Sequence, residues 1–223
     1  MSDCLSPSDI AQIFAEEIAA ARGEVTDPFV DGTRVFVRGV LPPSIEVAPK
    51  DSVRGGVALS ATDTDIYVHP YVFRIVCTNG AIMAKATQTR RIERDEFALE
   101  SSIRQAIGDC CRPESFIMAA DQIRSSREIA ADMAIMMAAF DRTRRGTMWT
   151  RFFADILRRY HDAADTSAFG LMNAVTSVAR DTREPEARWR LEVLGGTIPA
   201  MLHPGKSPRR PARPAARSLV QVG

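Results

Sequence analysis

The chain of 223 residues is 45% hydrophobic and 26% charged, a composition typical of a globular protein that buries a core. Its net charge of +1 hides an asymmetry, because residues 203–223 contain five Lys or Arg and no acidic residue. The preceding residues carry 24 basic against 28 acidic side chains, a net charge of −4. An acidic body followed by a basic tail indicates a polyanionic partner.

Neither a secretory leader nor a membrane span is predicted. The first residues lack the basic start and apolar stretch of a signal peptide, and no apolar run approaches the length of a span. The four cysteines show neither CxxC spacing nor the pattern of a disulfide framework. Because adjacent cysteines reach disulfide geometry only with strain, we expect Cys110 and Cys111 to be packed thiols. We therefore expect a cytoplasmic protein.

A capped helix is predicted over residues 6–22. Ser6 suits the N-cap, Pro7 the first helical position, and Asp9 completes a capping box. Apolar residues recur at helical spacing until Gly23, which is typical of a helix end.

From about residue 33 to 94 the apolar period changes to two, and short polar connections predict an antiparallel meander rather than βαβ units. Residues 33–41 and 44–51 read as two separate strands. Pro70 interrupts the run 65–78 and is expected at an edge position, a bulge or a junction between two short strands. Asn79-Gly80 predicts a type I′ hairpin turn, because both residues tolerate positive φ.

Helical spacing returns from about residue 95 to 200. One predicted helix begins at Asp95 and faces Phe97, Ile103 and Ile107 inward. A long helix is predicted over residues 113–146, and the last helix is expected to end near residues 195–196.

Strands and helices are therefore segregated along the chain, which indicates the α+β class. We expect a single domain over residues 1–202, in which an antiparallel β-meander of about residues 33–94 packs against the helical half 95–202. Residues 203–223 are rich in Pro and Arg and cannot bury enough apolar surface to fold, so a disordered basic tail is predicted.

The sequence contains no recognisable catalytic or metal-binding motif. Its three histidines form no HExxH pattern, no CxxC pair is present, and the Arg-Gly-Gly at 54–56 lacks the residues of a phosphate-binding loop. Cys77 lies in an apolar run, where burial would raise the thiol pKa and make it inert. We expect no enzymatic activity, no metal and no cofactor.

Positive charge collects on the segment after Asn79-Gly80. Alternate positions place polar and basic side chains on one strand face, with no acidic residue before Glu93. Thr hydroxyls and Lys or Arg side chains suit a phosphate backbone. The predicted nucleic-acid contacts are Lys85, Arg90, Arg91 and Arg94, with Arg74 in support.

Three aromatic residues of the preceding strand leave two interpretations open. Tyr67, Tyr71 and Phe73 share one face and would stack bases if that face were open. Alternatively they form the buried face of the sheet, and the cations only protect a sheet edge. A second cationic group on the helices is interpreted as a weaker signal and a solvated face: Arg142, Arg144, Arg145, Arg151, Arg158 and Arg159.

The segment VHPYVFRIVCTNGAIM at 68–83 resembles the hallmark of the domain-of-unknown-function 932 family, the phage/plasmid-like proteins. Residues 42–65 resemble the family's lead-in, and residues 169–196 resemble its closing helix and glycine, so the resemblance covers roughly residues 30–196. It implies a role in handling DNA on mobile elements, in replication, recombination or conflict with the host. It implies no catalytic residues.

Two functions are carried forward, with an enzyme as a remote third. The first is a single-stranded DNA-binding protein that promotes strand annealing and assembles as a homo-oligomer, by analogy with annealing recombinases that combine a β-β-β-α core with a basic groove. The alternative is a non-enzymatic interaction protein that inhibits a host defence system by binding a protein partner.

Overall fold

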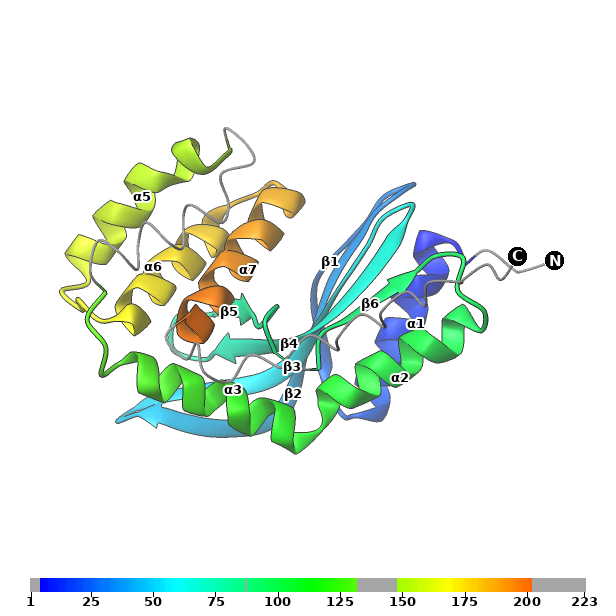
Figure 1. Ribbon diagram of the computed structural model, residues 1–223, viewed down its shortest axis with the longest axis horizontal. Coiled ribbons are helices and arrows are strands. Elements are labelled where there is room, and N and C mark those ends of the chain that lie inside the picture. Colours follow the sequence, from blue (N-terminus) through cyan, green and yellow to red (C-terminus); the bar gives the residue numbers. More distant parts are fainter. Residues whose placement is uncertain (1–4, 87, 132–147, 202–223) are drawn as a thin grey trace, which may run out of the picture.

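A computed structural model describes residues 5–86, 88–131 and 148–201. It confirms the α+β class: the N-terminal half forms a curled antiparallel sheet, and the C-terminal half is helical (Figure 1). The predicted basic tail and most of the second half of the long helix predicted over 113–146 lie outside the described residues.

Six strands form the sheet, and consecutive strands pair as the predicted meander requires. The order is β1-β2-β3-β4-β5. Strand β6 pairs with β4 as well, along the part of its edge that β5 does not reach. The strands are β1 (Glu24–Val30), β2 (Val35–Ala48), β3 (Asp51–Ala61), β4 (Asp65–Arg74), β5 (Asn79–Ile82) and β6 (Arg90–Glu93).

Two features of the sheet differ from the prediction. Strand β1 was not predicted, because Asp27 and Pro28 interrupt its pattern; the structure accommodates them with a register shift between Thr26 and Phe29. The two strands predicted over 33–51 are one long strand, β2, since a register shift between Val40 and Ser44 absorbs the two prolines there.

The described helices are α1 (Pro7–Ala20), α2 (Leu99–Cys111), α3 (Pro113–Ser126), α5 (Met148–Asp162), α6 (Ala168–Asp181) and α7 (Pro185–Met201). The capping box of α1 is confirmed: the Asp9 amide donates to Ser6 Oγ at 3.2 Å, and the Ser6 amide donates to Asp9 Oδ2 at 2.8 Å. Such a cap contributes about 1 kcal/mol to helix stability.

Three helix boundaries were predicted wrongly. Helix α2 begins at Leu99 after the left-handed residue Ala98, so Asp95 is no cap, and Phe97 is 94% exposed instead of facing inward. Helix α3 ends at Ser126, well short of residue 146. Helix α7 continues through Gly195-Gly196 instead of ending there. Glycine at residue 196 permits a close approach to the Ile82 carbonyl, with which a side chain at that position would collide.

One face of β2, β3, β4 and β6 is covered by α1 and α2. Side chains at helical spacing on α1 meet alternate residues of the strands, and Ile103 and Ile107 of α2 are fully buried as predicted. Each fully buried side chain of this size contributes about 1.5–3 kcal/mol. The central members of this core are Ile10, Phe14, Ile18, Val37, Leu59, Ile66, Ile103 and Ile107.

The other end of the sheet is enclosed by the C-terminal helices. Helices α3, α5, α6 and α7 build a second core with β5 and the adjacent ends of β3 and β4. Trp189 of α7 packs on the sheet face opposite to the one that α1 and α2 cover, against Phe36 and beside Tyr71. In Figure 1, α6 and α7 stand next to β5.

A buried ion pair fixes α7 on that face. Arg38 Nε of β2 donates to Glu192 Oε2 of α7 at 2.6 Å, and both side chains are at most 3% exposed. Arg188 donates to the second oxygen of Glu192 at 3.1 Å and to Asp27 of β1 at 2.8 Å. Burial raises the pKa of Glu192, although both arginines oppose that effect.

The predicted type I′ turn at Asn79-Gly80 is wrong, although the hairpin exists. Arg74 pairs with Asn79, so the connecting loop is Ile75–Thr78, and Thr78 takes the positive φ of 49°. Asn79 and Gly80 lie in β5. Gly80 is required there because a Cβ would lie 1.9 Å from Tyr71 Oη.

Pro70 lies within a continuous strand, and on one edge its carbonyl accepts a hydrogen bond from the Met83 amide at 2.9 Å. Strand β6 pairs with β4 at residues 65–68, and β5 pairs with it at residues 71–74. Because Pro70 lies between these two partners, its missing N–H leaves no ladder bond unmade on that edge. Of the three predicted alternatives, the edge position is closest to what is observed.

Candidate nucleic-acid interface

The five cations predicted to bind nucleic acid do not share one strand face. The segment predicted as a single return strand is divided into β5 and β6, and Lys85 lies exposed in the turns between them. Arg90 and Arg91 are adjacent residues of β6 and therefore point to opposite faces. Arg74 lies at the far end of β4. At the usual rise per residue of a strand, it is about 20 Å from the part of β4 that pairs with β6.

Most of these cations also have acidic or carbonyl partners. Arg91 Nε lies 2.8 Å from Asp65 Oδ1, and the bonds from Thr64 and Arg91 lower the pKa of that carboxyl. Arg90 lies 3.7 Å from Asp109, and Arg94 donates to the Leu5 carbonyl at 2.6 Å. Lys85 has no such contact with any other residue that the structure describes. Thr87 lies outside the described residues.

The predicted aromatic face is largely closed. Tyr71 is 2% exposed between β5 and α7, where Gly80 and Trp189 cover it. Tyr67 stacks on His69 with ring centroids 6.0 Å apart. The interpretation that this face is buried therefore holds for Tyr71, which leaves it unavailable to bases.

Arg74 belongs instead to a group at the β4–β5 hairpin. Its guanidinium donates to both oxygens of Asp51, at 2.8–3.1 Å, and lies 5.2 Å from the Phe169 ring centroid. Arg127, which follows α3, lies 4.6 Å from the same ring and 4.0 Å from Asp51. Two guanidinium groups thus share one carboxylate and one aromatic ring.

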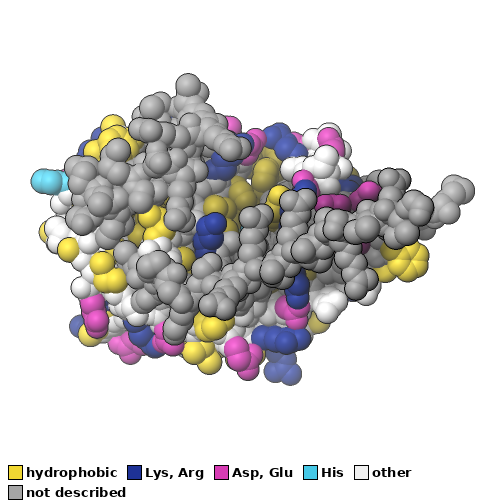
Figure 2. All heavy atoms as spheres, in the orientation of Figure 1, with side chains coloured by type: hydrophobic (Ala, Val, Ile, Leu, Met, Phe, Trp, Pro, Cys, Tyr) yellow, Lys and Arg dark blue, Asp and Glu magenta, His cyan; other side chains and the backbone are white. Residues whose placement is uncertain are grey.

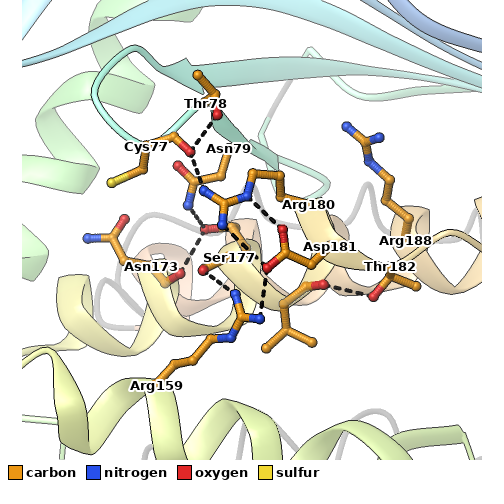
Figure 3. Close-up of polar contacts among 12 residues, drawn as sticks. Cys77, Thr78, Asn79, Arg159, Asn173, Ser177, Arg180, Asp181, Thr182 and Arg188 are labelled. Carbon is orange, nitrogen blue, oxygen red and sulfur yellow. Dashed lines mark hydrogen bonds and ion pairs between the residues drawn. The ribbon is translucent and has the colours of Figure 1, made fainter.

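The hairpin loop connects this pair to two further arginines. Arg74 Nη1 donates to Cys77 Sγ at 3.1 Å, and Arg180 Nη1 donates to the Cys77 carbonyl at 2.8 Å. Figure 3 shows Arg180 and Arg159 meeting at Asp181, which lies 2.8 Å from Arg159 and 2.9 Å from Arg180. Together the four residues Arg74, Arg127, Arg159 and Arg180 form what we call the hairpin arginine group.

The hairpin arginine group carries a surplus of positive charge. Four guanidinium groups face two carboxylates in direct contact, Asp51 and Asp181, and Asp165 adds a weaker interaction with Arg74. Arg180 and Arg159 lower the pKa of Asp181 to about 2, so it stays ionised. The arginine side chains remain 19–38% exposed. Donors are therefore left for an anionic ligand.

The tip of the hairpin is apolar and exposed. Ile75 is 43% exposed and Val76 60% exposed, directly beside the Arg180 contact at Cys77. The loop is held by the Ile75 amide, which donates to the Ser52 carbonyl at 3.1 Å. Exposed apolar side chains thus precede Cys77, which two guanidinium groups contact, and this combination suits a ligand with negative charge and flat apolar surfaces.

Among the described residues, the catalytic options remain few. His69 is 6% exposed, and burial lowers its pKa to about 4. Cys77 is not in a strand, contrary to the prediction, but lies half-buried in the hairpin loop. Burial raises the pKa of Cys110 to about 12 and of Cys111 to about 11. No three His, Cys, Asp or Glu side chains in the described ranges converge as metal ligands would.

Sequence reasoning found Arg74 but missed Arg127 and Arg180. Arg127 contacts Asp51 of β3 and Arg180 contacts Cys77 of the hairpin loop, which lie 76 and 103 positions away in the sequence, and no local pattern signals such pairs. Arg159 was noted only as part of a solvated helical face. Elsewhere, basic and acidic side chains are interspersed over the face shown in Figure 2.

In comparisons with known proteins, no protein-family model, no curated protein and no solved structure matches the chain. Of the helices described, none is long and apolar enough to cross a bilayer.

Proposed function

We propose that the protein binds single-stranded DNA and that the hairpin arginine group is its principal contact. The observation that carries the proposal is the linked set of four guanidinium groups around an exposed hairpin. Arginine is suited to phosphate because its planar fork offers paired donors. Ile75 and Val76 would contact unstacked bases, which duplex DNA keeps inside its stack.

The basic tail adds to this proposal through its charge alone. Residues 203–223 carry five Lys or Arg and no acidic residue, so they would strengthen binding without sequence preference. The proposed setting is a phage or plasmid, as the family resemblance implies. The proposed activity there is strand annealing, for which the protein would first bind single strands.

Assembly into an oligomer, if it accompanies annealing, would use surfaces other than the β1 edge. Asp27 takes a positive φ of 46° there, and Pro28 follows it at the register shift. Both features discourage pairing with the edge of another sheet.

The assignment is tested by fluorescence anisotropy with labelled single-stranded and duplex DNA across a salt series. The variant Arg127→Gln/Arg180→Gln should weaken single-strand binding and flatten its salt dependence, because two phosphate contacts are lost. The matched control Arg158→Gln/Arg190→Gln removes the same charge from side chains paired within their own helices and should bind nearly as the parent does.

A third variant separates this site from the original prediction. Lys85→Gln/Arg91→Gln removes two of the cations on the β5–β6 segment, outside the hairpin arginine group. If this variant loses binding while Arg127→Gln/Arg180→Gln keeps it, the site lies where the sequence placed it and our assignment is wrong.

The alternative function, binding of a protein partner, is favoured by exposed apolar side chains. Phe97 is 94% exposed on the turn before α2, and Val76 is 60% exposed at the hairpin tip. Aromatic side chains such as Phe97 are enriched at protein interfaces. No DNA binding at low salt, together with a partner lost in Phe97→Ser, would favour this function over the first.

A further inference from the structure

A small cavity lies behind the hairpin, between β4, β5, α3 and α6. It has a volume of about 10 Å³, close to the space that one water molecule needs. Apolar side chains, including Val72, Ile123 and Met172, form much of its wall. Its polar lining comes from Arg74, Asn79, Asn173 and Thr176.

The contacts of the Thr176 hydroxyl define one orientation of the Asn79 amide. Thr176 Oγ1 donates its single hydrogen to a carbonyl of its own helix, that of Met172 at 3.0 Å. Towards Asn79 the hydroxyl can therefore only accept, and it does so from Asn79 Nδ2 at 2.7 Å. Asn79 Oδ1 is left without a partner, on a side chain that is 4% exposed.

A second buried acceptor lies at the same cavity. Asn173 Oδ1 is also buried and unpartnered, and Figure 3 shows the Asn173 amide beside Asn79 with this oxygen on the near side. Two carbonyl oxygens cannot satisfy each other, because neither carries a hydrogen. An unpaired buried acceptor is unfavourable, and a group that donates two hydrogen bonds would satisfy both oxygens.

We propose that the cavity binds one water molecule, which donates one hydrogen to Asn79 Oδ1 and the other to Asn173 Oδ1. Water has the required two donors and fits the volume. A metal cation is a poor occupant, since it prefers about six oxygen ligands and would face the Arg74 guanidinium that lines the same cavity.

The bound water joins the hairpin strand β5 to helix α6 directly behind the hairpin arginine group. Asn79 is the residue that pairs with Arg74, and Asn173 lies two turns before Arg180 on α6. The water therefore completes a polar connection that holds these two arginines in a fixed relation. This inference concerns packing and holds whether or not the protein binds DNA.

A crystal structure of the full chain at about 1.5 Å resolution tests the proposal, with water-to-amide-proton NOEs at Ala81 as the measurement in solution. We expect a density peak within hydrogen-bond distance of both Oδ1 atoms and an NOE from a long-lived water. Absence of the peak would overturn the proposal. So would an Asn79 or Asn173 amide turned so that its Nδ2 donates directly to the other amide's Oδ1, because that bond leaves the water no role.

Two variants separate the water from ordinary packing at Asn173. Asn173→Asp keeps an acceptor of the same shape and should retain the water peak. Asn173→Leu removes the acceptor, and we expect the peak and its NOE to disappear and the urea midpoint to fall. A peak that persists unchanged in Asn173→Leu would show that Asn173 does not hold the water, which contradicts the proposal.

Discussion

At the scale of single residues, His69 is a buried group whose pKa the fold moves away from neutral pH. Its ring stacks between Tyr67 and Trp189, and its Nδ1 lies 3.2 Å from Thr89 Oγ1. Burial in this layer disfavours the charged imidazolium and lowers the pKa of His69 from 6.5 to about 4. The neutral ring is therefore part of the folded structure at neutral pH.

This burial predicts acid-sensitive stability. Since the unfolded chain binds the His69 proton near pH 6.5 and the folded chain only near pH 4, stability falls as the pH drops between these values. The loss amounts to about 3 kcal/mol at most. Urea unfolding of His69→Gln should show a flatter pH dependence between pH 6.5 and 4, and an unchanged profile would contradict the account.

Gly80 gives a second prediction at this scale. A methyl group there would overlap the Tyr71 ring, so Gly80→Ala should lower the free energy of unfolding by several kcal/mol. In the double variant Gly80→Ala/Tyr71→Leu the clash is removed, and the loss should be smaller than the sum of the two single losses. Additive losses in urea unfolding would show that the contact does not limit residue 80.

Asn79 and Gly80 also show where local sequence signals lose to tertiary contacts. The dipeptide favours a turn on backbone grounds, but here Asn79 bonds to Thr176 of α6 and Gly80 accommodates Tyr71. The first requirement comes from a residue 97 positions away, and the second comes from the partner strand of the hairpin. The hairpin itself was predictable, whereas its turn residues were not.

At the scale of elements, the join between α7 and the sheet depends on the buried Arg38–Glu192 pair. Each charge is stabilised by its partner at 2.6 Å, and removal of one leaves the other buried and uncompensated. Glu192→Leu should therefore lower the free energy of unfolding by about 3–5 kcal/mol.

The matched double variant tests the reason for this loss. Arg38→Met/Glu192→Leu replaces both charges with apolar groups, and Arg188 retains Asp27 as a partner. Its loss in urea unfolding should be clearly smaller than that of Glu192→Leu alone. An equal or larger loss would mean that the helix contact depends on shape and not on charge compensation.

The helices and strands were predictable where the sequence shows a clear apolar period. Helix α1 shows its cap and apolar spacing in the sequence, and the meander shows its period of two. The long strand β2 and the break between β5 and β6 were missed, since register shifts and partner changes arise from the assembled sheet. The α+β class therefore followed from the sequence, and the register did not.

At the scale of the whole molecule, the candidate site is assembled from β4, its hairpin loop, the end of α3, α5 and α6. Only Arg74 among its four arginines was predicted, because the other three join the group through contacts with residues of other elements: Arg127 with Asp51, Arg180 with Cys77 and Arg159 with Asp181. The predicted cations on β6 are instead divided between two sheet faces and paired with acids. The charge pattern along the segment therefore did not predict which cations the fold brings together.

The salt dependence of single-stranded DNA binding by the full chain tests the central claim most directly. If the four arginines each displace a counterion, the logarithm of the association constant should fall with the logarithm of salt concentration with a slope of about −3, steeper if the tail also binds. Arg127→Gln/Arg180→Gln should make that slope shallower by about 1.4. A slope that this variant leaves unchanged, or no binding at low salt, would contradict the account.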